Sequence, residues 1–363
     1  MAVIARTRWL PAVRSLSWGW TAAALLLVGL LAVPMLVVAA GALRPAGESW
    51  DHVARNLLPQ YLSNTAFLAA ASGVVALTFG LGCAWLVSMC DFPLRGFFRW
   101  ALALPLAVPP YMAAYTYTGM LGVTGPVQRI VRALVPAYRD AFLYWNVMRI
   151  EVLAVIFGAV LYPYVFLLTR ALFEQRSGRT LEAARLMGSR PFTVFARVAV
   201  PLARPAVVAG LALVLMEVLN DYGAVTYYGV TTFTTGIFRA WFSLGDLDTA
   251  VRLSGILMVV VLMVLGAERW QRGAARYDEG AAGRPVSRYR LRPVAATGAV
   301  AFCAVPFLLG FLIPVVQLAL WTLFHLEDVF TPAFGRLALN SFLLALLASV
   351  LCVAIAVVIA YAA

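Results

Sequence analysis

The stretch that decides the class of fold runs from Thr180 to Val207 and reads TLEAARLMGSRPFTVFARVAVPLARPAV. It carries four arginines, a glutamate, a lone glycine and three prolines, and long apolar runs lie on both sides of it. A charged, helix-forming element between two apolar runs of about 20 residues indicates a segment outside a membrane, joining two helices that cross it.

The composition of the whole chain supports this interpretation. Hydrophobic residues make up 63% of the 363 residues, charged residues make up 12%, and the mean hydropathy is +0.89. A soluble domain is about half apolar and a quarter charged. Inside lipid every backbone polar group needs a partner within the protein, so apolar runs of this length predict helices. We therefore expect an all-α, polytopic membrane protein with about eight transmembrane helices, at 18–43, 61–90, 100–120, 150–172, 205–228, 252–268, 294–324 and 338–363.

The arginines predict the orientation. The first apolar run is longer than the core of about 7–15 residues in a cleaved signal peptide, so we interpret it as an uncleaved span. With the tail 1–17 in the cytoplasm, nineteen of the 28 arginines lie on the cytoplasmic side and nine on the other. We expect a multi-pass membrane protein surrounded by lipid, with its N-terminus in the cytoplasm. The net charge of +12 does not indicate nucleic acid, because the arginines sit in short loops between apolar runs.

The segment 121–149 on the outer side leaves two interpretations open. Its arginines and aromatic residues follow a helix-like pattern, which is typical of a helix lying flat in the headgroup region. A packed loop explains the same residues equally well.

A weak internal repeat predicts two halves. Residues 64–87 align without gaps to 340–363, with Asn64 on Asn340 and Trp85 on Tyr361. We interpret the two asparagines, which open equivalent spans, as helix caps. We expect a first core at 60–268, a polar cytoplasmic linker at 269–293, and the start of a second core at 294–363. The chain stops inside the repeated span, so we expect the second core to be truncated here or to continue in a longer protein.

The charged stretch has the pattern of a helix–turn–helix within a cytoplasmic loop at 173–205. Gly188 can adopt the left-handed conformation that ends a helix. Ser189 can then cap the next helix, with Pro191 in its first turn. Phe192 and Phe195 would form one apolar stripe on that second helix. Such a loop presents small residues and an apolar ridge, which indicates either a cytosolic partner or an amphipathic helix anchored to the lipid surface.

The stretch resembles the cytoplasmic EAA loop of binding-protein-dependent ABC importer permeases. That family's pattern is Glu-Ala-Ala, three residues, Gly, nine residues, then Ile-x-Leu-Pro. Here the matching positions are Glu182, Ala183, Ala184, Gly188, Val198, Val200 and Pro201, with valine in place of isoleucine and leucine. The resemblance implies a type I permease core whose loop couples it to two copies of an ATP-binding subunit. It also implies a location in the bacterial inner membrane, a periplasmic solute-binding protein and a second permease core, fused or missing.

The absence of lysine bears on the energy source. All 28 basic residues are arginine, whereas a phosphate-binding P-loop needs a lysine. We therefore expect no ATP site and no cofactor in this chain, and ATP hydrolysis in a partner. No zinc-protease motif, nucleophile motif or paired carboxylates across spans support a membrane-embedded enzyme.

A second resemblance concerns the cargo. Residues 216–250 resemble the corresponding region of ferric iron permeases, including Glu217, the run 221–225, the run 228–230 and the run 233–237. This implies ferric iron as the substrate. Related permeases for thiamine, polyamines or other small solutes share much of this plan. An ion-gradient-driven secondary transporter, with Glu217 and Asp221 as proton or sodium sites, is the alternative from another class.

Four residues are candidates for the substrate path: Glu217, Asn220, Asp221 and Tyr222. We place Glu217 near the middle of its span, where a charge costs about 2.5–3.5 kcal/mol and should face a cavity or partner. Carboxylate and phenol oxygens suit a hard ferric ion. A structural pairing of Glu217 and an aromatic belt at the outer surface remain open as alternatives. No residues have the spacing of a firm metal site.

Prolines are expected to distort the third span. Pro105, Pro109 and Pro110 cannot donate backbone hydrogen bonds, so the helix at 100–120 should break or kink. Kinked helices line transport paths in some proteins and serve packing in others, and both roles are open here.

Replacing Gly188 or Glu182 is expected to lower transport and assembly with the ATP-binding subunit while membrane insertion survives. A side chain at Gly188 opposes the left-handed turn that orients the loop. Uptake by cells, co-purification of the ATP-binding subunit and the amount of protein in the membrane fraction measure the three quantities. If both variants transport normally, the assigned role of the loop is wrong.

Overall fold

The computed structural model describes residues 18–45, 47–134, 146–176, 191–272, 288–326 and 331–362. These residues are almost entirely helical, and seven helices among them are long and apolar enough to cross a membrane. The all-α, polytopic prediction is confirmed. Contacts divide the chain into one unit at 41–324 and a second made of 1–40 and 325–363.

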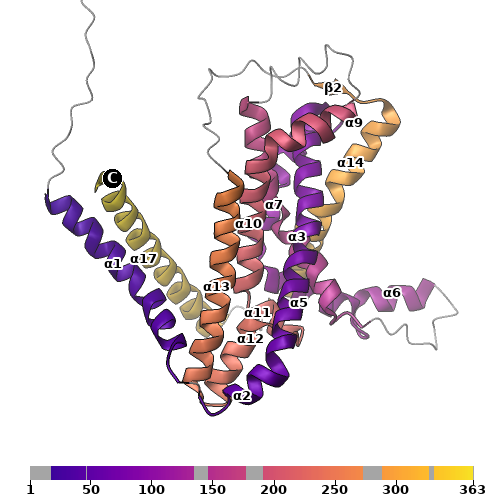
Figure 1. Cartoon of the computed structure of the whole chain (residues 1–363). Coiled ribbons are helices and arrows are strands. Elements are labelled where there is room, and N and C mark those ends of the chain that lie inside the picture. Colours follow the sequence, from indigo (N-terminus) through magenta and orange to yellow (C-terminus); the bar gives the residue numbers. More distant parts are fainter. Residues whose placement is uncertain are drawn as a thin grey trace, which may run out of the picture. The chain divides into compact units, whose positions relative to one another are not determined.

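The elements of the larger unit follow one another along the chain (Figure 1). After α1 they are α2 (Trp50–His52), η1 (Val53–Leu57), α3 (Leu58–Met89), β1 (Cys90–Asp91), α4 (Arg95–Ala101), η2 (Leu104–Ala107), α5 (Pro110–Leu121), α6 (Pro126–Leu134), α7 (Ile150–Arg176), α9 (Pro191–Val194), η4 (Phe195–Ala199), α10 (Val200–Asn220), α11 (Gly223–Tyr227), α12 (Phe233–Phe238), η5 (Arg239–Ser243), α13 (Leu247–Arg272), β2 (Tyr289–Arg290), α14 (Pro293–Phe307), η6 (Leu308–Leu312) and α15 (Ile313–Phe324).

The second unit contains two long helices, α1 (Trp18–Ala42) and α17 (Pro332–Ala362). The most apolar window of each helix has no buried residue. A helix that is apolar all round and buries nothing on its own is typical of a membrane span, surrounded by lipid or by other spans.

The centre of the larger unit is α7, which packs against α3 and α10 (Figure 1). In its most apolar window 72% of the residues are buried, the highest share among the candidate spans. Glycines allow this packing. A Cβ on Gly80 of α3 would lie 2.6 Å from Val165 Cβ, and one on Gly210 of α10 would lie 2.6 Å from Val165 Cα. Small residues at such points let helix backbones approach closely within a membrane protein.

The predicted span at 100–120 is not one helix. It is divided into α4, the 3₁₀ turn η2 and α5, so the structure contains seven long spans where we expected eight. Val108 and Pro109 are both extended, with ψ of 112° and 139°. Each precedes a proline, and the proline ring excludes the helical conformation from the residue before it. The expected break is therefore confirmed at Val108–Pro109.

The predicted span at 205–228 ends early. The helix stops at Asn220, and Asp221 takes an extended conformation with ψ of 129°. The Asp221 carboxylate accepts the backbone N–H groups of Ala224 and Val225 at 2.9 and 3.2 Å and so begins the short helix α11. A carboxylate that satisfies free N–H groups at a helix start competes with continuation of the preceding helix.

The helix from Pro293 to Phe324 packs onto α3, α4, α5 and α7. It contains the π-helical segment η6 just before Pro314. In a π-helix the backbone N–H of residue 314 would donate to the Leu309 carbonyl, but Pro314 has no N–H. The Tyr117 hydroxyl donates to this carbonyl instead, at 2.6 Å. The π-helical segment is therefore stabilised by a side chain from α5.

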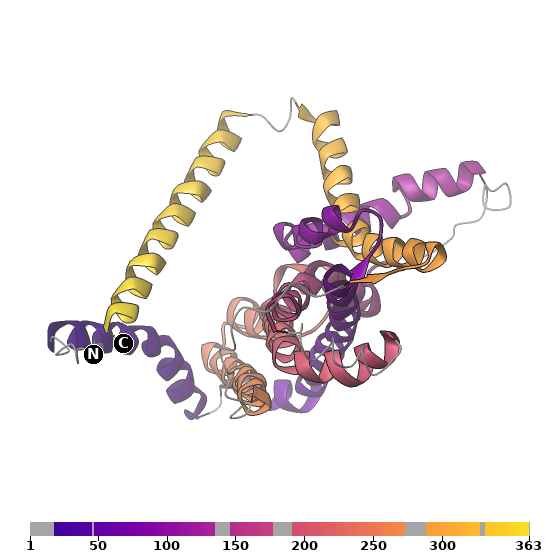
Figure 2. The same ribbon diagram turned by 90° about the horizontal axis from the view of Figure 1, so that it is seen from above.

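The segment 121–149 contains one described helix, α6. Figures 1 and 2 both show it projecting away from the helices that pack around α7. Residues 135–145 lie outside the described part of the chain. The helix is consistent with the interfacial alternative, which remains a prediction.

Gly210→Ala is expected to destabilise the protein, because the new Cβ would meet the backbone of Val165, which cannot move aside. Overpacking of this kind costs about 1–3 kcal/mol. Thermal unfolding of the purified protein in detergent measures the effect.

Gly266→Ala in α13 is the matched control, since a Cβ there meets nothing within 4 Å. We expect this variant to be neutral or slightly more stable, because alanine favours helix over glycine. Equal melting temperatures for the two variants would contradict the packing interpretation.

Candidate functional site

The candidate residues lie toward the two ends of the long helices. The last turn of α7 and the start of α9 lie at one end (Figure 1). α10 runs from that end to Asn220, and α13 returns from Leu247, so α11, α12 and η5 lie at the opposite end (Figure 1). We call these the loop end and the far end.

At the loop end, only part of the predicted coupling loop can be placed. Glu182, Ala183, Ala184 and Gly188 lie outside the described residues. Val198 is partly buried and packs against the hydrophobic core, whereas Pro201 is exposed at the start of α10. α9 contains Pro191, the first described residue after the gap at 177–190. The role of these residues in coupling stays a prediction.

Trp85, near the end of α3, anchors this part of the loop. Its ring lies 5.1 Å from Phe195, 6.0 Å from Phe173 and 6.3 Å from Tyr289, measured between ring centroids. These partners come from η4, α7 and β2, so one side chain joins four segments. The sequence analysis missed this residue, and its alignment with Tyr361 in the repeat was the available signal.

An apolar groove opens beside Trp85. It has a volume of about 420 Å³ and is lined by Trp85, Phe192, Phe195, Leu291 and Phe302 among others. Phe192 is 77% exposed at its edge, and Phe195 packs against the core. The two phenylalanines predicted to form one apolar stripe are thus divided between the surface and the core.

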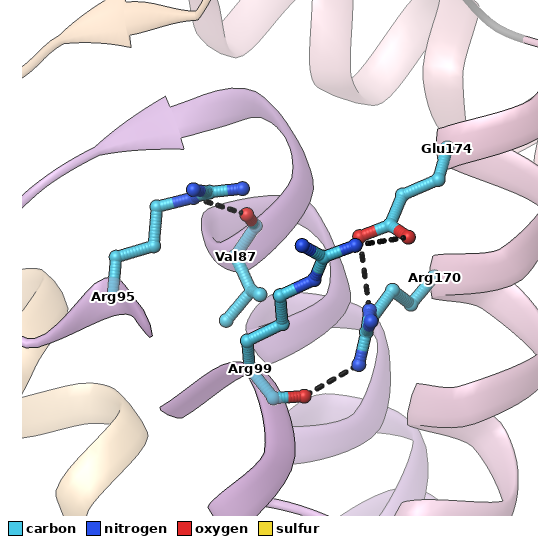
Figure 3. A network of polar contacts seen from close by, with 5 residues as sticks. All are labelled: Val87, Arg95, Arg99, Arg170 and Glu174. Carbon is cyan, nitrogen blue, oxygen red and sulfur yellow. Dashed lines mark hydrogen bonds and ion pairs between the residues drawn. The ribbon is translucent and has the colours of Figure 1, made fainter. Parts of the chain in front are cut away.

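A network of polar contacts fixes the end of α7 that enters the loop (Figure 3). The Glu174 carboxylate pairs with Arg99 of α4 at 3.2 Å and with Arg170 of α7 at 3.0 Å. Arg170 also donates to the Arg99 carbonyl, and Arg95 donates to the Val87 carbonyl at 2.7 Å. α4 is therefore bonded to the last turns of both α3 and α7. Partly exposed ion pairs contribute about 0.2–1 kcal/mol each, so the network orients these helices more than it stabilises the fold.

A short parallel pairing completes the loop end. Cys90 and Asp91 of β1 lie opposite Tyr289 and Arg290 of β2. The pairing joins the end of α3 to the last part of the predicted linker at 269–293.

Toward the far end, the candidate path residues divide between two pockets. Glu217 and Asn220 are exposed on α10 and line a pocket of about 280 Å³ with Leu257 and Val261 of α13. Tyr222 is 39% exposed and lines a different pocket of about 230 Å³. The Asp221 carboxylate is occupied by the two N–H groups of α11. The structure therefore brings Glu217 and Asn220 together and separates them from Tyr222.

Glu217 has a partner that the sequence analysis missed. The Tyr164 hydroxyl of α7 donates to its carboxylate at 3.3 Å. α10 continues unbroken from the α9 segment, so Pro191–Asn220 is one span of 30 residues, and Glu217 lies three residues before its end. The predicted position near the middle of the span is wrong, because the helix begins before residue 205 and ends before residue 228.

Two further expectations concern caps and metals. Asn64 is not a helix cap, as its place in the repeat suggested. It lies inside α3, and its amide donates to the backbone carbonyl and hydroxyl of Thr231 at 2.9 and 3.0 Å.

Among the described residues, no three His, Cys, Asp or Glu side chains gather as they would around a metal ion.

Comparison with known proteins gives the family. The family model described as a binding-protein-dependent transport system inner membrane component matches residues 76–267. The Fe(3+)-transport system permease protein FbpB 2 of Haemophilus influenzae is 26% identical over 309 residues, covering 83% of this chain and 56% of that protein. The probable ABC transporter permease protein y4fN of Sinorhizobium fredii is 26% identical, covering 80% and 52%. The chain thus spans about half the length of these curated relatives.

Shorter relatives and solved structures agree on the fold. The molybdenum transport system permease protein ModB of Escherichia coli is 27% identical over 217 residues, covering 58% of this chain and 90% of that protein. A chain of the bacterial alginate ABC transporter, solved in complex with an alginate-pentasaccharide-bound periplasmic protein, superposes with a TM-score of 0.56. That alignment covers 70% of this chain and 94% of that chain at 15% identity, so it shows the fold alone.

If the exposed face of α10 lines an aqueous path, a cysteine at Asn220 should react rapidly with a charged, membrane-impermeant thiol reagent. The reactive thiolate forms only where water reaches the sulfur. The experiment starts from a background in which Cys83, Cys90, Cys303 and Cys352 are replaced.

Met263→Cys is the matched control, because Met263 of α13 is 60% exposed in a strongly apolar span. We expect it to react at least about ten-fold more slowly than the cysteine at Asn220, since exposure to lipid supplies no water. Equal rates at the two positions would contradict an aqueous path along α10.

Proposed function

Because this chain belongs to the family of binding-protein-dependent transport system inner membrane components, we propose that it is the membrane-spanning permease of an ABC importer for ferric iron. A periplasmic solute-binding protein delivers the cargo on the outer side. The ATP-binding subunits, in two copies, bind the cytoplasmic loop and supply the energy. A second permease core completes the path.

One observation carries this proposal: the family match extends from α3 to α13 and contains the complete Glu182–Pro201 spacing. That spacing is the part of the sequence most specific to a coupling loop. The assignment of iron rests on the Fe(3+)-transport relative, which aligns along 83% of the chain.

The geometry of α10 supports a mechanical role for the loop. Pro191–Asn220 is one unbroken span of 30 residues, which rises about 1.5 Å per residue or about 45 Å in all. A displacement of the loop end therefore moves Glu217 and Asn220 directly. The network of Arg99, Arg170 and Glu174 makes α4 and the end of α7 follow the same displacement. In this mechanism ATP-driven closure of the partner opens the path to the outside.

The chemistry near Glu217 favours a cation over an oxyanion. The carboxylate is exposed, and its Tyr164 partner is a phenol rather than an arginine. Oxygen ligands of this type suit a hard ferric ion, whereas a carboxylate repels an oxyanion such as molybdate. The ModB relative is named for molybdenum transport. A path that releases its cargo needs weak contacts, and an exposed carboxylate with one hydrogen-bond partner provides such a contact.

Uptake of radioactive ferric iron by cells with the native gene, compared with a strain that lacks it, tests the proposal. We expect uptake to disappear in the deletion strain and in a strain without the ATP-binding subunit, because the permease has no energy source of its own. Glu217→Gln should lower uptake more than Tyr164→Phe, since only the first removes a charge from the path.

Two results would overturn the proposal. Uptake that persists without the ATP-binding subunit and collapses with an uncoupler would indicate a secondary transporter. Loss of molybdate uptake with unchanged iron uptake in the deletion strain would show that the cargo is wrong while the class of transporter is right.

A further inference from the structure

Four aromatic rings form a continuous stack at the far end, opposite the loop. Tyr222 lies 4.0 Å from Phe238, Phe238 lies 5.8 Å from Phe242, and Phe242 lies 4.7 Å from Trp241, between ring centroids with near-parallel planes. Trp241 is 50% and Phe242 69% exposed. We call these four residues the aromatic stack. Such a stack exposes a large, rigid apolar surface.

A polar pocket lies against the aromatic stack. Three of the four rings line it, and its volume is about 230 Å³. Hydroxyl groups of Thr226, Thr231 and Ser243 also line it, and Arg239 is its single charged lining residue. We call this the Arg239 pocket. It pairs one positive charge with several hydrogen-bond donors, which is the donor set of an anion site.

Arg239 is held in place by a neutral partner. Its guanidinium lies beside the phenol of Tyr61, a residue of α3 that is only 1% exposed. Gly236 allows this approach, because a Cβ there would lie 2.6 Å from the Tyr61 ring. The buried phenol orients the guanidinium without neutralising it. Arg239 therefore keeps its charge for a ligand.

Two carboxylates near Arg239 already accept hydrogen bonds from other groups. Asp221 accepts two backbone N–H groups of α11. Asp246 accepts the N–H of Ser49 at 3.0 Å and both the N–H and hydroxyl of Thr249 at 2.9 and 2.8 Å. Burial alone would raise the pKa of Asp246, but these hydrogen bonds outweigh it and lower the pKa below its usual value. Within the described part of the chain, Arg239 forms no ion pair.

From this arrangement we propose that the Arg239 pocket and the aromatic stack form the docking site for the periplasmic solute-binding protein. A carboxylate side chain of that protein enters the pocket and pairs with Arg239, while its apolar rim covers Trp241 and Phe242. The inference rests on the proposed function, which requires such a delivery protein on this side. Charge selects the occupant: the pocket favours an acidic group and disfavours the ferric cargo itself.

The combination of one arginine with exposed aromatic rings fits a protein partner. Arginine, tryptophan and tyrosine dominate the binding energy of protein interfaces, and they act best in a pocket that excludes water. An aromatic belt at the lipid surface would not need a charged pocket between its rings. A free small anion would not need a flat, exposed stack of rings.

Titration of the solute-binding protein onto the permease complex tests the site. The complex, with its ATP-binding subunits, is held in lipid nanodiscs, and the probe is the solute-binding protein whose addition stimulates ATP hydrolysis by the wild type. Arg239→Gln should raise the Kd at least about ten-fold at low salt, because a charge-assisted hydrogen bond is lost. It should also flatten the dependence of the Kd on salt. Trp241→Ala should raise the Kd at both low and high salt.

Arg55→Gln is the matched control. Arg55 is an exposed arginine of η1 at the same end, outside the pocket, so its loss should leave the Kd unchanged. Arg239→Lys should retain part of the affinity, which separates loss of charge from misfolding. Arg239→Glu should regain binding when the matching acidic residue of the solute-binding protein is replaced by arginine.

Several outcomes would overturn the site. An unchanged Kd for Arg239→Gln, with the wild type stimulated normally, contradicts the docking site alone. Reduced membrane insertion of Trp241→Ala with an unchanged Kd shows that the rings face lipid. Phosphate bound by the wild type but not by Arg239→Gln, with an unchanged Kd, shows a free-anion site. Failure of every solute-binding protein to stimulate the wild type contradicts the proposed function and this inference with it.

Discussion

The close backbone approach of α7 to α3 and α10 is the contact on which the larger unit depends. Val165 fills the space that Gly80 and Gly210 leave open, and a Cβ at either glycine would overlap it. Lipid provides no hydrophobic force to bring helices together, so packing at short range must do so. The positions of the candidate residues follow from this contact. α10 brings Glu217 within hydrogen-bond distance of Tyr164 because Gly210 lets α10 pack against the turn of α7 that contains Val165.

Prolines interrupt the hydrogen bonds within two of the helices, and the carbonyl groups left free contact neighbouring helices. Pro163 cannot donate to the Ala159 carbonyl, and Gly310 of η6 packs directly on that carbonyl, where a Cβ would lie 2.1 Å away. Pro314 leaves the Leu309 carbonyl to Tyr117. Each freed backbone group thus meets another helix. These contacts attach the helix 293–324 to the first core at the points where the helical hydrogen bonds are interrupted.

The two ends of the larger unit differ in chemistry, as the proposed binding of different partners at each end requires. The loop end combines an apolar groove beside Trp85 with a network of arginines around one glutamate. The far end presents an aromatic stack beside a pocket with one positive charge. The continuous span Pro191–Asn220 joins the loop end to the candidate path, which is the connection that the proposed coupling requires.

The sequence by itself determined the class of fold, the long apolar helices, the break at the prolines of 105–110 and the family, because these depend on local composition, helix chemistry and a fixed spacing. It did not determine where α10 ends, since the Asp221 carboxylate captures the N–H groups of α11 only once the chain has turned. It missed Trp85, Tyr164 and the Arg239 pocket, and it took Asn64 for a cap. Each of these roles depends on a partner far away in the sequence, and only helix packing in three dimensions brings such partners within contact distance.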